Sequence, residues 1–206
     1  MWFKRAFDIA FSATVLLLLA PLLAVIALWV RCDSPGPIFY LQGRVGRHGQ
    51  PFRIYKVRTM RVGADAAGPQ ITIGRDARIT RAGHFLRRTK LDELPQFANV
   101  LRGDMSVVGP RPEVPRYVAL YPSDLAAQVL SVRPGITDLA SLAFRNEGEL
   151  LARSDDPERT YVQDILPAKL QYACQYVQTR SLWLDLSIIV HTVAALAGSP
   201  RTPRSP

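Results

Sequence analysis

Near the N-terminus of this 206-residue chain, 22 consecutive residues from Ile9 to Val30 carry no charged side chain. At about 1.5 Å per residue, a straight helix of this length would be about 33 Å long, enough to cross a bilayer. Pro21 lies near the middle of the run, where its ring removes one helical N–H and clashes with the carbonyl four residues earlier. The sequence therefore predicts a membrane helix that is kinked near Pro21, with arms too short to span separately.

Basic residues lie on both sides of this run. Lys4 and Arg5 precede it, and the basic residues that follow are Arg31, Arg44, Arg47, Arg53, Lys56 and Arg58. Because basic flanks favour the cytoplasmic side of a membrane, a helix that bends at Pro21 and returns to the same face satisfies both flanks. We therefore expect a re-entrant membrane helix hairpin, broken at Pro21 and anchored by Lys4 and Arg5. A kinked spanning helix and a signal peptide are the alternatives.

The positive charge is concentrated in one third of the chain. The whole chain has 26 Lys and Arg against 17 Asp and Glu, and residues 31–102 alone hold 14 basic and 5 acidic residues, which is the entire excess of +9. Nucleic acid, anionic lipid headgroups and phosphate-bearing substrates all suit such a field. With 48% hydrophobic residues the chain is not disordered, and its two cysteines give no disulfide framework.

The body of the chain predicts a small mixed domain. An apolar stretch at 38–42 and alternating apolar and basic residues at 52–58 flank a glycine-rich turn, which predicts two strands. Apolar residues recur at helical spacing in 181–198, which predicts an amphipathic helix that either packs on a core or lies on a membrane.

We therefore expect an α+β fold with three parts. These are a re-entrant membrane helix over residues 1–32, a helix-rich cytosolic catalytic domain with amphipathic interfacial helices over 33–198, and a disordered tail over 199–206.

Two adjacent carboxylates provide the strongest local chemistry. Asp92 and Glu93 come just before Pro95 and an apolar helical run, so we expect Asp92 near a helix N-cap, where the helix dipole favours ionised carboxylates. Capping residues, metal ligands and a carboxylate nucleophile all fit this position. The cations around the pair are Arg87, Arg88, Lys90 and Arg111. Such a frame suits a substrate with several phosphate charges bridged by a divalent ion.

Several long motifs occur in an order that resembles the bacterial sugar transferases of the monotopic phosphoglycosyl transferase family. The motifs are DSPGPIFYLQGRVGRHGQPFRIYKVRTM, KLDELPQFANVLRGDMSVVGPRP, VRPGIT and SLWLDL, and with the N-terminal segment they cover nearly the whole chain. The resemblance implies an enzyme that moves sugar-1-phosphate from a UDP-sugar to polyprenyl (undecaprenyl) phosphate and releases UMP. This would be the first membrane step in the synthesis of exopolysaccharide, O-antigen, capsule or a glycoprotein glycan.

The resemblance also assigns roles to residues. It implies that Asp92 is a nucleophile that forms a phosphosugar intermediate and that Glu93 binds Mg²⁺. The residues expected around the phosphates are Lys56, Arg58, Arg87, Arg88 and Arg111. By the same resemblance the enzyme works at the phospholipid surface, on the cytoplasmic face of the bacterial inner membrane. We expect no nucleic-acid partner, and a homodimer is a further expectation.

The chain departs from the family pattern in three places. Ala20 precedes Pro21 where many members have serine, Glu113 follows GPRP where leucine is frequent, and residues 138–144 keep little of the usual motif. Arg145 and Asn146, which do match, are candidates for donor binding. A non-enzymatic membrane-attached protein that binds anionic lipid or nucleic acid, and a hydrolase that uses water as acceptor, remain as alternative functions.

Overall fold

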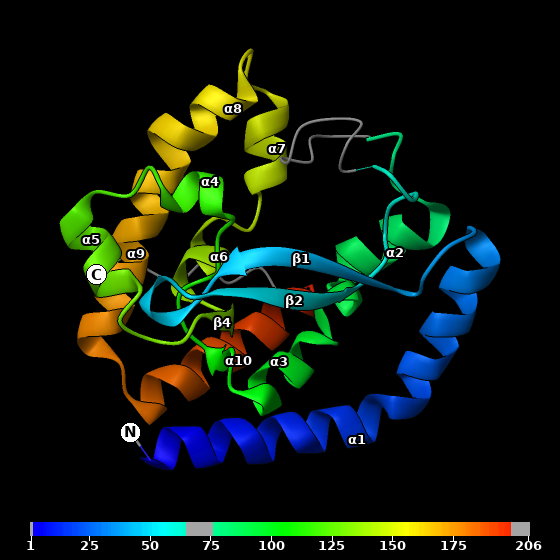
Figure 1. The fold of residues 1–206 in the computed structure, drawn as a ribbon, viewed down its shortest axis with the longest axis horizontal. Helices are drawn as coiled ribbons and strands as arrows, with labels where there is room; N and C mark the ends of the chain where they lie inside the picture. The colour runs from blue at the N-terminus through cyan, green and yellow to red at the C-terminus, as the bar shows by residue number, and fades with distance from the viewer. Residues whose placement is uncertain (1, 65–75, 199–206) are drawn as a thin grey trace.

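The computed structural model describes residues 2–64 and 76–198 (Figure 1). It is mostly helical and contains two small sheets. The helices are α1 (Trp2–Asp33), α2 (Arg81–Thr89), α3 (Gln96–Arg102), α4 (Pro115–Val118), α5 (Ser123–Val129), α6 (Leu139–Ala143), α7 (Glu147–Ala152), α8 (Pro157–Thr160), α9 (Leu166–Thr179) and α10 (Leu182–Leu196). The strands are β1 (Phe39–Val45), β2 (Pro51–Val57), β3 (Ser106–Val108) and β4 (Gly135–Thr137). The predicted tail at 199–206 lies outside the described residues.

The two predicted strands are confirmed as an antiparallel hairpin. β1 pairs with β2 in a register that runs from Phe39 opposite Val57 to Val45 opposite Pro51. A short 3-10 turn, η1 (Arg47–Gly49), connects them, and Gly49 has a φ of +76° that suits glycine. The second sheet is a parallel pair of β3 and β4, with Ser106 opposite Gly135 and Val108 opposite Thr137.

α1 is one continuous helix of 32 residues with Pro21 inside it. Figure 1 shows that its ribbon changes direction, with one arm along the base of the molecule and the other rising beside α2. It is long and apolar enough to cross a membrane. The sequence predicted a hairpin of two arms broken at Pro21. In the described residues the two arms instead form one continuous, bent helix.

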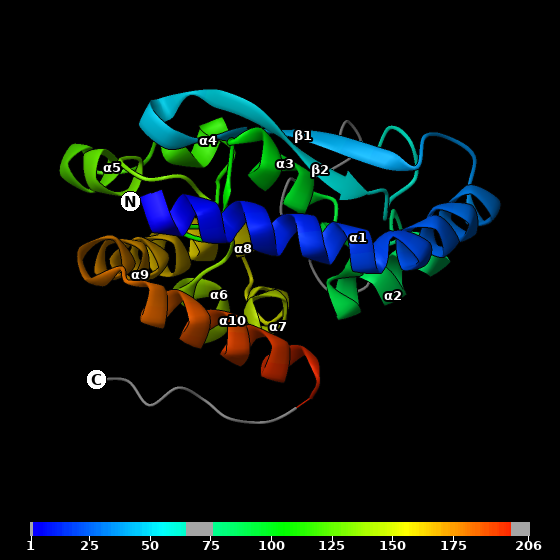
Figure 2. The ribbon, with the colours of Figure 1, turned by 90° about the horizontal axis from the view of Figure 1, so that it is seen from below.

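Both arms of α1 pack against the rest of the protein. Asp8 and Ser12 are buried in the first arm, and Ile26 and Val30 in the second. Figure 2 shows α1 running across the molecule between the β1–β2 hairpin and α10. Leu17, between these contacts, is 78% exposed. The helix therefore touches the domain near its two ends and leaves apolar surface around its middle.

Polar contacts fasten the N-terminal arm. Lys4 donates to the Asp185 carboxylate at 2.6 Å and to the Val108 carbonyl at 3.2 Å, and Arg5 donates to the Val100 carbonyl at 2.8 Å. The Asp8 carboxylate accepts hydrogen bonds from the Ser106 hydroxyl and from a backbone N–H of β3. The two basic residues predicted as membrane anchors thus also bind the domain itself.

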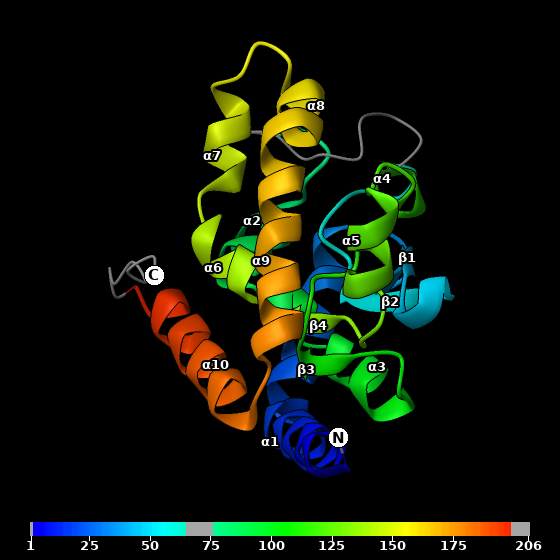
Figure 3. The same ribbon diagram turned by 90° about the vertical axis from the view of Figure 1, so that its left-hand side faces the viewer.

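The central core forms where the hairpin, β3, α3, α9 and α10 meet. Its buried members are Ile54, Val100, Met105, Val107, Val108, Tyr176 and Ile188. Each fully buried apolar side chain of this size contributes roughly 1.5–3 kcal/mol. Figure 3 shows α9 between α10 on one side and the hairpin on the other. On α10, Ile188 and Asp185 face this core whereas Trp183 is 84% exposed, so the helix predicted for 181–198 is confirmed, but its exposed face is apolar and not polar as in an amphipathic helix.

Candidate active site

The two adjacent carboxylates lie in a tight turn between two helices. α2 ends at Thr89, Lys90 adopts a left-handed conformation with φ of 58°, and Leu91–Glu93 form a 3-10 turn, η2. Pro95, not Asp92, is the N-cap of α3, and no side chain caps that helix. The expectation that Asp92 lies near the N-cap is therefore wrong: the left-handed Lys90 and the 3-10 turn move it one turn earlier. Helix capping does not explain the carboxylate.

α3 is held against β2 by Asn99, which is fully buried. The Asn99 side chain accepts a hydrogen bond from the Tyr55 N–H at 2.9 Å and donates to the Arg53 carbonyl at 2.8 Å. These bonds fix the backbone of β2 directly beside Lys56. Because η2 leads into α3, the same bonds bring the carboxylate turn next to the Lys56 side chain.

The buried carboxylate of Glu93 is paired with two cationic side chains. Arg111 donates to both of its carboxylate oxygens, at 2.5 Å and 3.3 Å, and the Lys56 ammonium lies 3.4 Å from one of them. Burial alone would raise the pKa of Glu93, but the positive charges of Arg111 and Lys56 outweigh it and hold the pKa well below its usual value. The cations of Arg111 and Lys56 therefore favour the ionised form of Glu93.

Asp92 differs from its neighbour. It is 6% exposed, and among the described residues its Oδ1 has no hydrogen-bond partner. Burial raises its pKa above the usual aspartate value, the charge of Lys56 opposes this, and the negative charge of Glu93 adds to it. Two adjacent carboxyl groups whose pKa values are pushed apart are suited to different tasks, one as a fixed charge and one as a reactive group. The Oδ1 atom of Asp92 is buried and keeps unused hydrogen-bond acceptor capacity.

Arg111 is placed by the turn that follows β3. The Gly109 N–H donates to the Thr137 carbonyl and the Gly135 N–H donates to the Pro110 carbonyl, so this turn is bound to the end of β4. A Cβ on Gly109 would lie 2.6 Å from the Arg133 carbonyl oxygen, so only glycine allows this approach. The prolines at 110 and 112 and these bonds fix the backbone that presents the Arg111 guanidinium.

The structure brings together some of the predicted phosphate ligands and not others. Lys56 and Arg111 contact Glu93 directly, and the charge of the half-buried Arg87 contributes to the pKa of Asp92. Arg88 is exposed and lies over the Phe85 ring at 6.0 Å, on a different face of α2.

Arg58 has another environment. Its guanidinium is buried and donates to the carbonyls of Val30, Ser34 and Pro35 at the C-terminal end of α1. The expectation of a phosphate ligand does not fit this geometry, because the donors are used to close the C-terminal end of α1.

The donor-binding candidates Arg145 and Asn146 also lie outside this group. Arg145 is exposed and donates to the Ala195 carbonyl at the end of α10. Asn146 is exposed and is the residue before α7.

Glu113, whose role the sequence left open, is a structural partner. It accepts a hydrogen bond from the Tyr161 hydroxyl at 2.7 Å and pairs with Arg44 at 3.4 Å. Tyr161 begins a π-helical segment, η3 (Tyr161–Ile165), and such segments often occur near functional sites. Glu113 thus connects β1 to the segment that leads into α9, just beyond Arg111.

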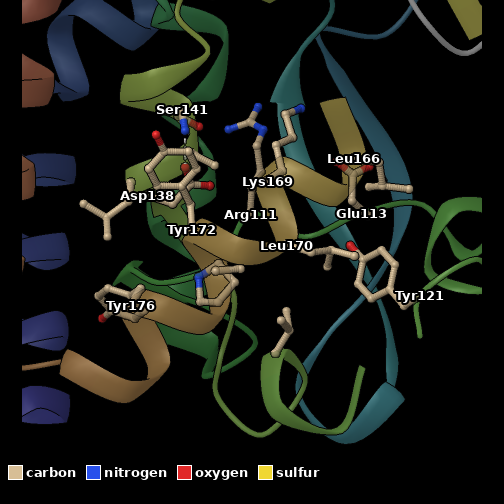
Figure 4. Close-up of a pocket in the computed structure, with 15 residues that line it drawn as sticks. Arg111, Glu113, Tyr121, Asp138, Ser141, Leu166, Lys169, Leu170, Tyr172 and Tyr176 are labelled. Carbon is tan, nitrogen blue, oxygen red and sulfur yellow. Dashed lines mark hydrogen bonds between the residues drawn. The ribbon is translucent and has the colours of Figure 1, made fainter. Parts of the chain in front are cut away.

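A cavity lies beside Arg111 and was not anticipated from the sequence (Figure 4). Its polar lining includes Asp138, Ser141 and Lys169. The sequence signal that could have identified it is the departure from the family motif at 138–144, which supplies Asp138 and Ser141.

The described residues contain no group of three or more histidine, cysteine, aspartate or glutamate side chains that could hold a metal. The site does offer two carboxylates. Mg²⁺ commonly binds one or two protein carboxylates and takes its other ligands from water and substrate phosphates, so the donor set fits that ion.

Comparison with known proteins gives the family. Residues 1–199 match the model of the family described as bacterial sugar transferase. The UDP-glucose:undecaprenyl-phosphate glucose-1-phosphate transferase of Escherichia coli (strain K12) is 37% identical over 193 residues, which are 92% of this chain and 39% of that protein. The protein of the same name from Caulobacter vibrioides is 39% identical over 197 residues, 94% of this chain and 69% of that protein.

A relative of similar length is the exopolysaccharide production protein PSS of Rhizobium leguminosarum bv. phaseoli, which is 40% identical over 200 residues, 93% of this chain and 94% of that protein. The chain spans about two fifths of the Escherichia coli relative. With a family model that matches nearly its whole length, the chain belongs to the bacterial sugar transferase family.

Proposed function

We propose that this protein transfers a sugar-1-phosphate from a UDP-sugar to undecaprenyl phosphate and releases UMP, as an early step of exopolysaccharide synthesis. The observation that carries the proposal is the contrast between the two adjacent carboxylates. Glu93 is clamped by Arg111 and Lys56, whereas the buried Asp92 keeps one oxygen without a partner. The names of relatives from Escherichia coli and Caulobacter vibrioides, both UDP-glucose:undecaprenyl-phosphate glucose-1-phosphate transferases, support the choice of donor and acceptor.

The reaction has two displacement steps at one phosphorus atom. First, an oxygen of ionised Asp92 attacks the β-phosphorus of the donor, and the bond from that phosphorus to the bridging oxygen breaks, so that UMP leaves with the electron pair. Second, an oxygen of the lipid phosphate attacks the phosphorus of the phosphosugar intermediate, and the Asp92 carboxylate leaves. Arg111 and Lys56 neutralise phosphate charge in both steps because their positions are already fixed by Glu93.

Glu93 would hold Mg²⁺. When bound, the ion supplies further neutralisation of the diphosphate. The chain's own contribution is to keep Glu93 ionised, which the lowered pKa of that side chain supports.

We also propose that α1 enters and leaves the membrane on one face, over residues 1–32, and that residues 33–198 form the catalytic domain on the cytoplasmic side. The support is the position of its ends. Lys4 binds Asp185, and the carbonyl of Val30 near the other end binds Arg58, so both ends contact the same domain. A helix that crossed the bilayer would place about 30 Å of hydrocarbon between its ends. The exposed apolar side chains of α1 and α10 would lie in the lipid.

The first experiment measures UMP release by the protein in nanodiscs from a panel of UDP-sugars, with and without Mg²⁺ and undecaprenyl phosphate. Asp92→Asn is expected to abolish turnover because a neutral amide is not a nucleophile of this kind. Asp155→Asn, at an exposed position, is the matched control and should retain wild-type turnover. Full activity of Asp92→Asn would refute the mechanism, and UMP release that does not depend on undecaprenyl phosphate would indicate hydrolysis.

The topology is tested by labelling with a membrane-impermeant maleimide. Cys32 is exposed near one end of α1, and Phe3→Cys in a Cys32→Ser background places a single exposed thiol near the other. Cys174 is buried. Both thiols should react in inverted vesicles and neither in intact spheroplasts. Opposite accessibility of the two would show a spanning helix.

A further inference from the structure

The cavity beside Arg111 is separate from the carboxylate turn but shares Arg111 with it. Its walls come from the turn after β3, from α6 and from α9. Figure 4 shows Arg111 and Lys169 extending side by side, with Asp138, Ser141 and Tyr172 along the neighbouring wall. A largely apolar cavity with a few convergent polar groups is the usual form of a small-molecule site.

Asp138 is the most unusual side chain in this cavity. It is 4% exposed, and its carboxylate accepts a hydrogen bond from the Ser141 N–H at the start of α6. An ionised carboxylate has about four acceptor sites, so the bond from Ser141 leaves acceptor capacity for a ligand. The charges of Arg111 and Lys169 are close enough to oppose the effect of burial, which raises its pKa. Asp138 is therefore a buried acceptor with cations nearby.

Helix capping alone does not require this burial. Asp156 caps α8 in the same way, accepting from the Arg159 N–H at 3.0 Å, and it is exposed. Burying a carboxylate costs free energy that an exposed cap avoids. Asp138, by contrast, is buried in the wall of a cavity that opens beside Arg111, the cation proposed to bind phosphate.

We infer that this cavity binds a hydroxyl-bearing ring of the donor and that Asp138 accepts hydrogen bonds from the ring hydroxyls, which makes Asp138 a specificity-determining residue. The inference rests on the proposed function, because Arg111 then binds the diphosphate and directs an attached ring into the cavity. Carboxylates pair with neighbouring hydroxyl donors, and the apolar side chain of Leu139 and the aromatic ring of Tyr172 suit the nonpolar face of such a ring. The ring is either the transferred pyranose or the ribose of the nucleotide.

The test compares Asp138→Asn with the matched control Asp156→Asn. Both substitutions keep a side-chain oxygen that can cap the helix, so both variants should fold. For each variant in nanodiscs, we would measure KM and kcat for the UDP-sugar that the wild type uses, the Ki of UMP, and the relative kcat/KM of other UDP-sugars. Loss of hydrogen bonds to a charged acceptor should raise KM about 10- to 100-fold in Asp138→Asn, with a smaller change in kcat. Asp156→Asn should match the wild type.

The measured constants show whether the ring in the cavity is the pyranose or the ribose. If the pyranose lies in the cavity, Asp138→Asn raises KM and alters selectivity among sugars while the Ki of UMP is unchanged. If the ribose lies there, KM and the Ki of UMP rise together and selectivity is retained. Unchanged KM, Ki and selectivity in an active Asp138→Asn variant would overturn this inference and leave the proposed function standing. A wild type that turns over no UDP-sugar and is not inhibited by UMP would overturn both.

Discussion

Replacing Asp8 with alanine tests whether α1 is fastened to the catalytic domain as described. The Asp8 carboxylate is buried and accepts from the Ser106 hydroxyl at 2.8 Å and from the Val107 N–H at 3.1 Å. After the substitution, Ser106 can still donate to the Val108 carbonyl at 2.9 Å. The Val107 N–H lies in β3 and loses its acceptor, so most of the lost stability comes from this unpaired N–H.

The expected loss follows from these bonds. A buried N–H without an acceptor costs about 1–3 kcal/mol, and loss of the bond to Ser106 costs about 1 kcal/mol more. The sum is about 2–4 kcal/mol, and at about 2–4 °C per kcal/mol for a chain of this size, Tm should fall by roughly 4–16 °C. The ion pair between Lys4 and Asp185 at 2.6 Å remains, so α1 stays attached at its first turn.

The assay is thermal unfolding in detergent, followed by circular dichroism. Asp8→Asn should lose less stability because its amide oxygen can still accept from Val107. Asp155→Ala, an exposed aspartate, should change stability by no more than about 0.5 kcal/mol. An Asp8→Ala variant that melts within about 2 °C of the wild type would refute the reasoning, because a buried N–H cannot lose its acceptor without cost.

Three further outcomes are expected. Lys56→Met removes a cation that lowers the pKa of both Asp92 and Glu93. The acid limb of the pH profile of kcat/KM should therefore move to higher pH, and an acid limb that does not move would contradict this prediction. The pKa of Asp92 is raised in the folded protein, so its ionised form destabilises the fold above that pKa and not at low pH. Asp92→Asn should therefore raise Tm at about pH 8, and this gain should disappear as the pH falls through that pKa. An equal gain in Tm at low pH would contradict this prediction. Leu86→Ala, in the core between α2 and the second arm of α1, should cost about 2–5 kcal/mol in chemical denaturation, whereas a cost below about 1 kcal/mol would show that this arm is not packed.

Local sequence pattern predicted the elements that depend on local chemistry. The alternation in 52–58 and the glycines before it were enough to predict the β1–β2 hairpin, which the structure confirms. The apolar period in 181–198 was enough to predict α10, but it could not decide between a core face and an open face, because the helix has both. Which face of α10 is buried depends on the elements that pack against the helix.

The side chains of the site were harder to predict because their positions depend on tertiary contacts. Arg87 and Arg88 are neighbours in sequence, but successive residues on a helix point about 100° apart, so the charge of Arg87 acts on Asp92 whereas Arg88 lies on Phe85. Arg58 has the same residue type and charge as Arg111, yet it binds backbone carbonyls at the end of α1. Charge alone could not distinguish a phosphate ligand from a helix cap.

The two attachments of α1 end on the segments that carry Lys56 and Arg111, the cations of the proposed mechanism. At the N-terminal end, Lys4 and Asp8 bind β3, and the turn that follows β3 presents Arg111. At the other end, the Val30 carbonyl binds Arg58, two residues beyond Lys56 of β2. If α1 enters and leaves the membrane on one face, as proposed, the depth at which it sits would set the height of Lys56 and Arg111 above the lipid. In the proposed reaction, an acceptor phosphate confined to the membrane surface needs its cations at one height, and a helix held at both ends by the domain would provide this without crossing the bilayer.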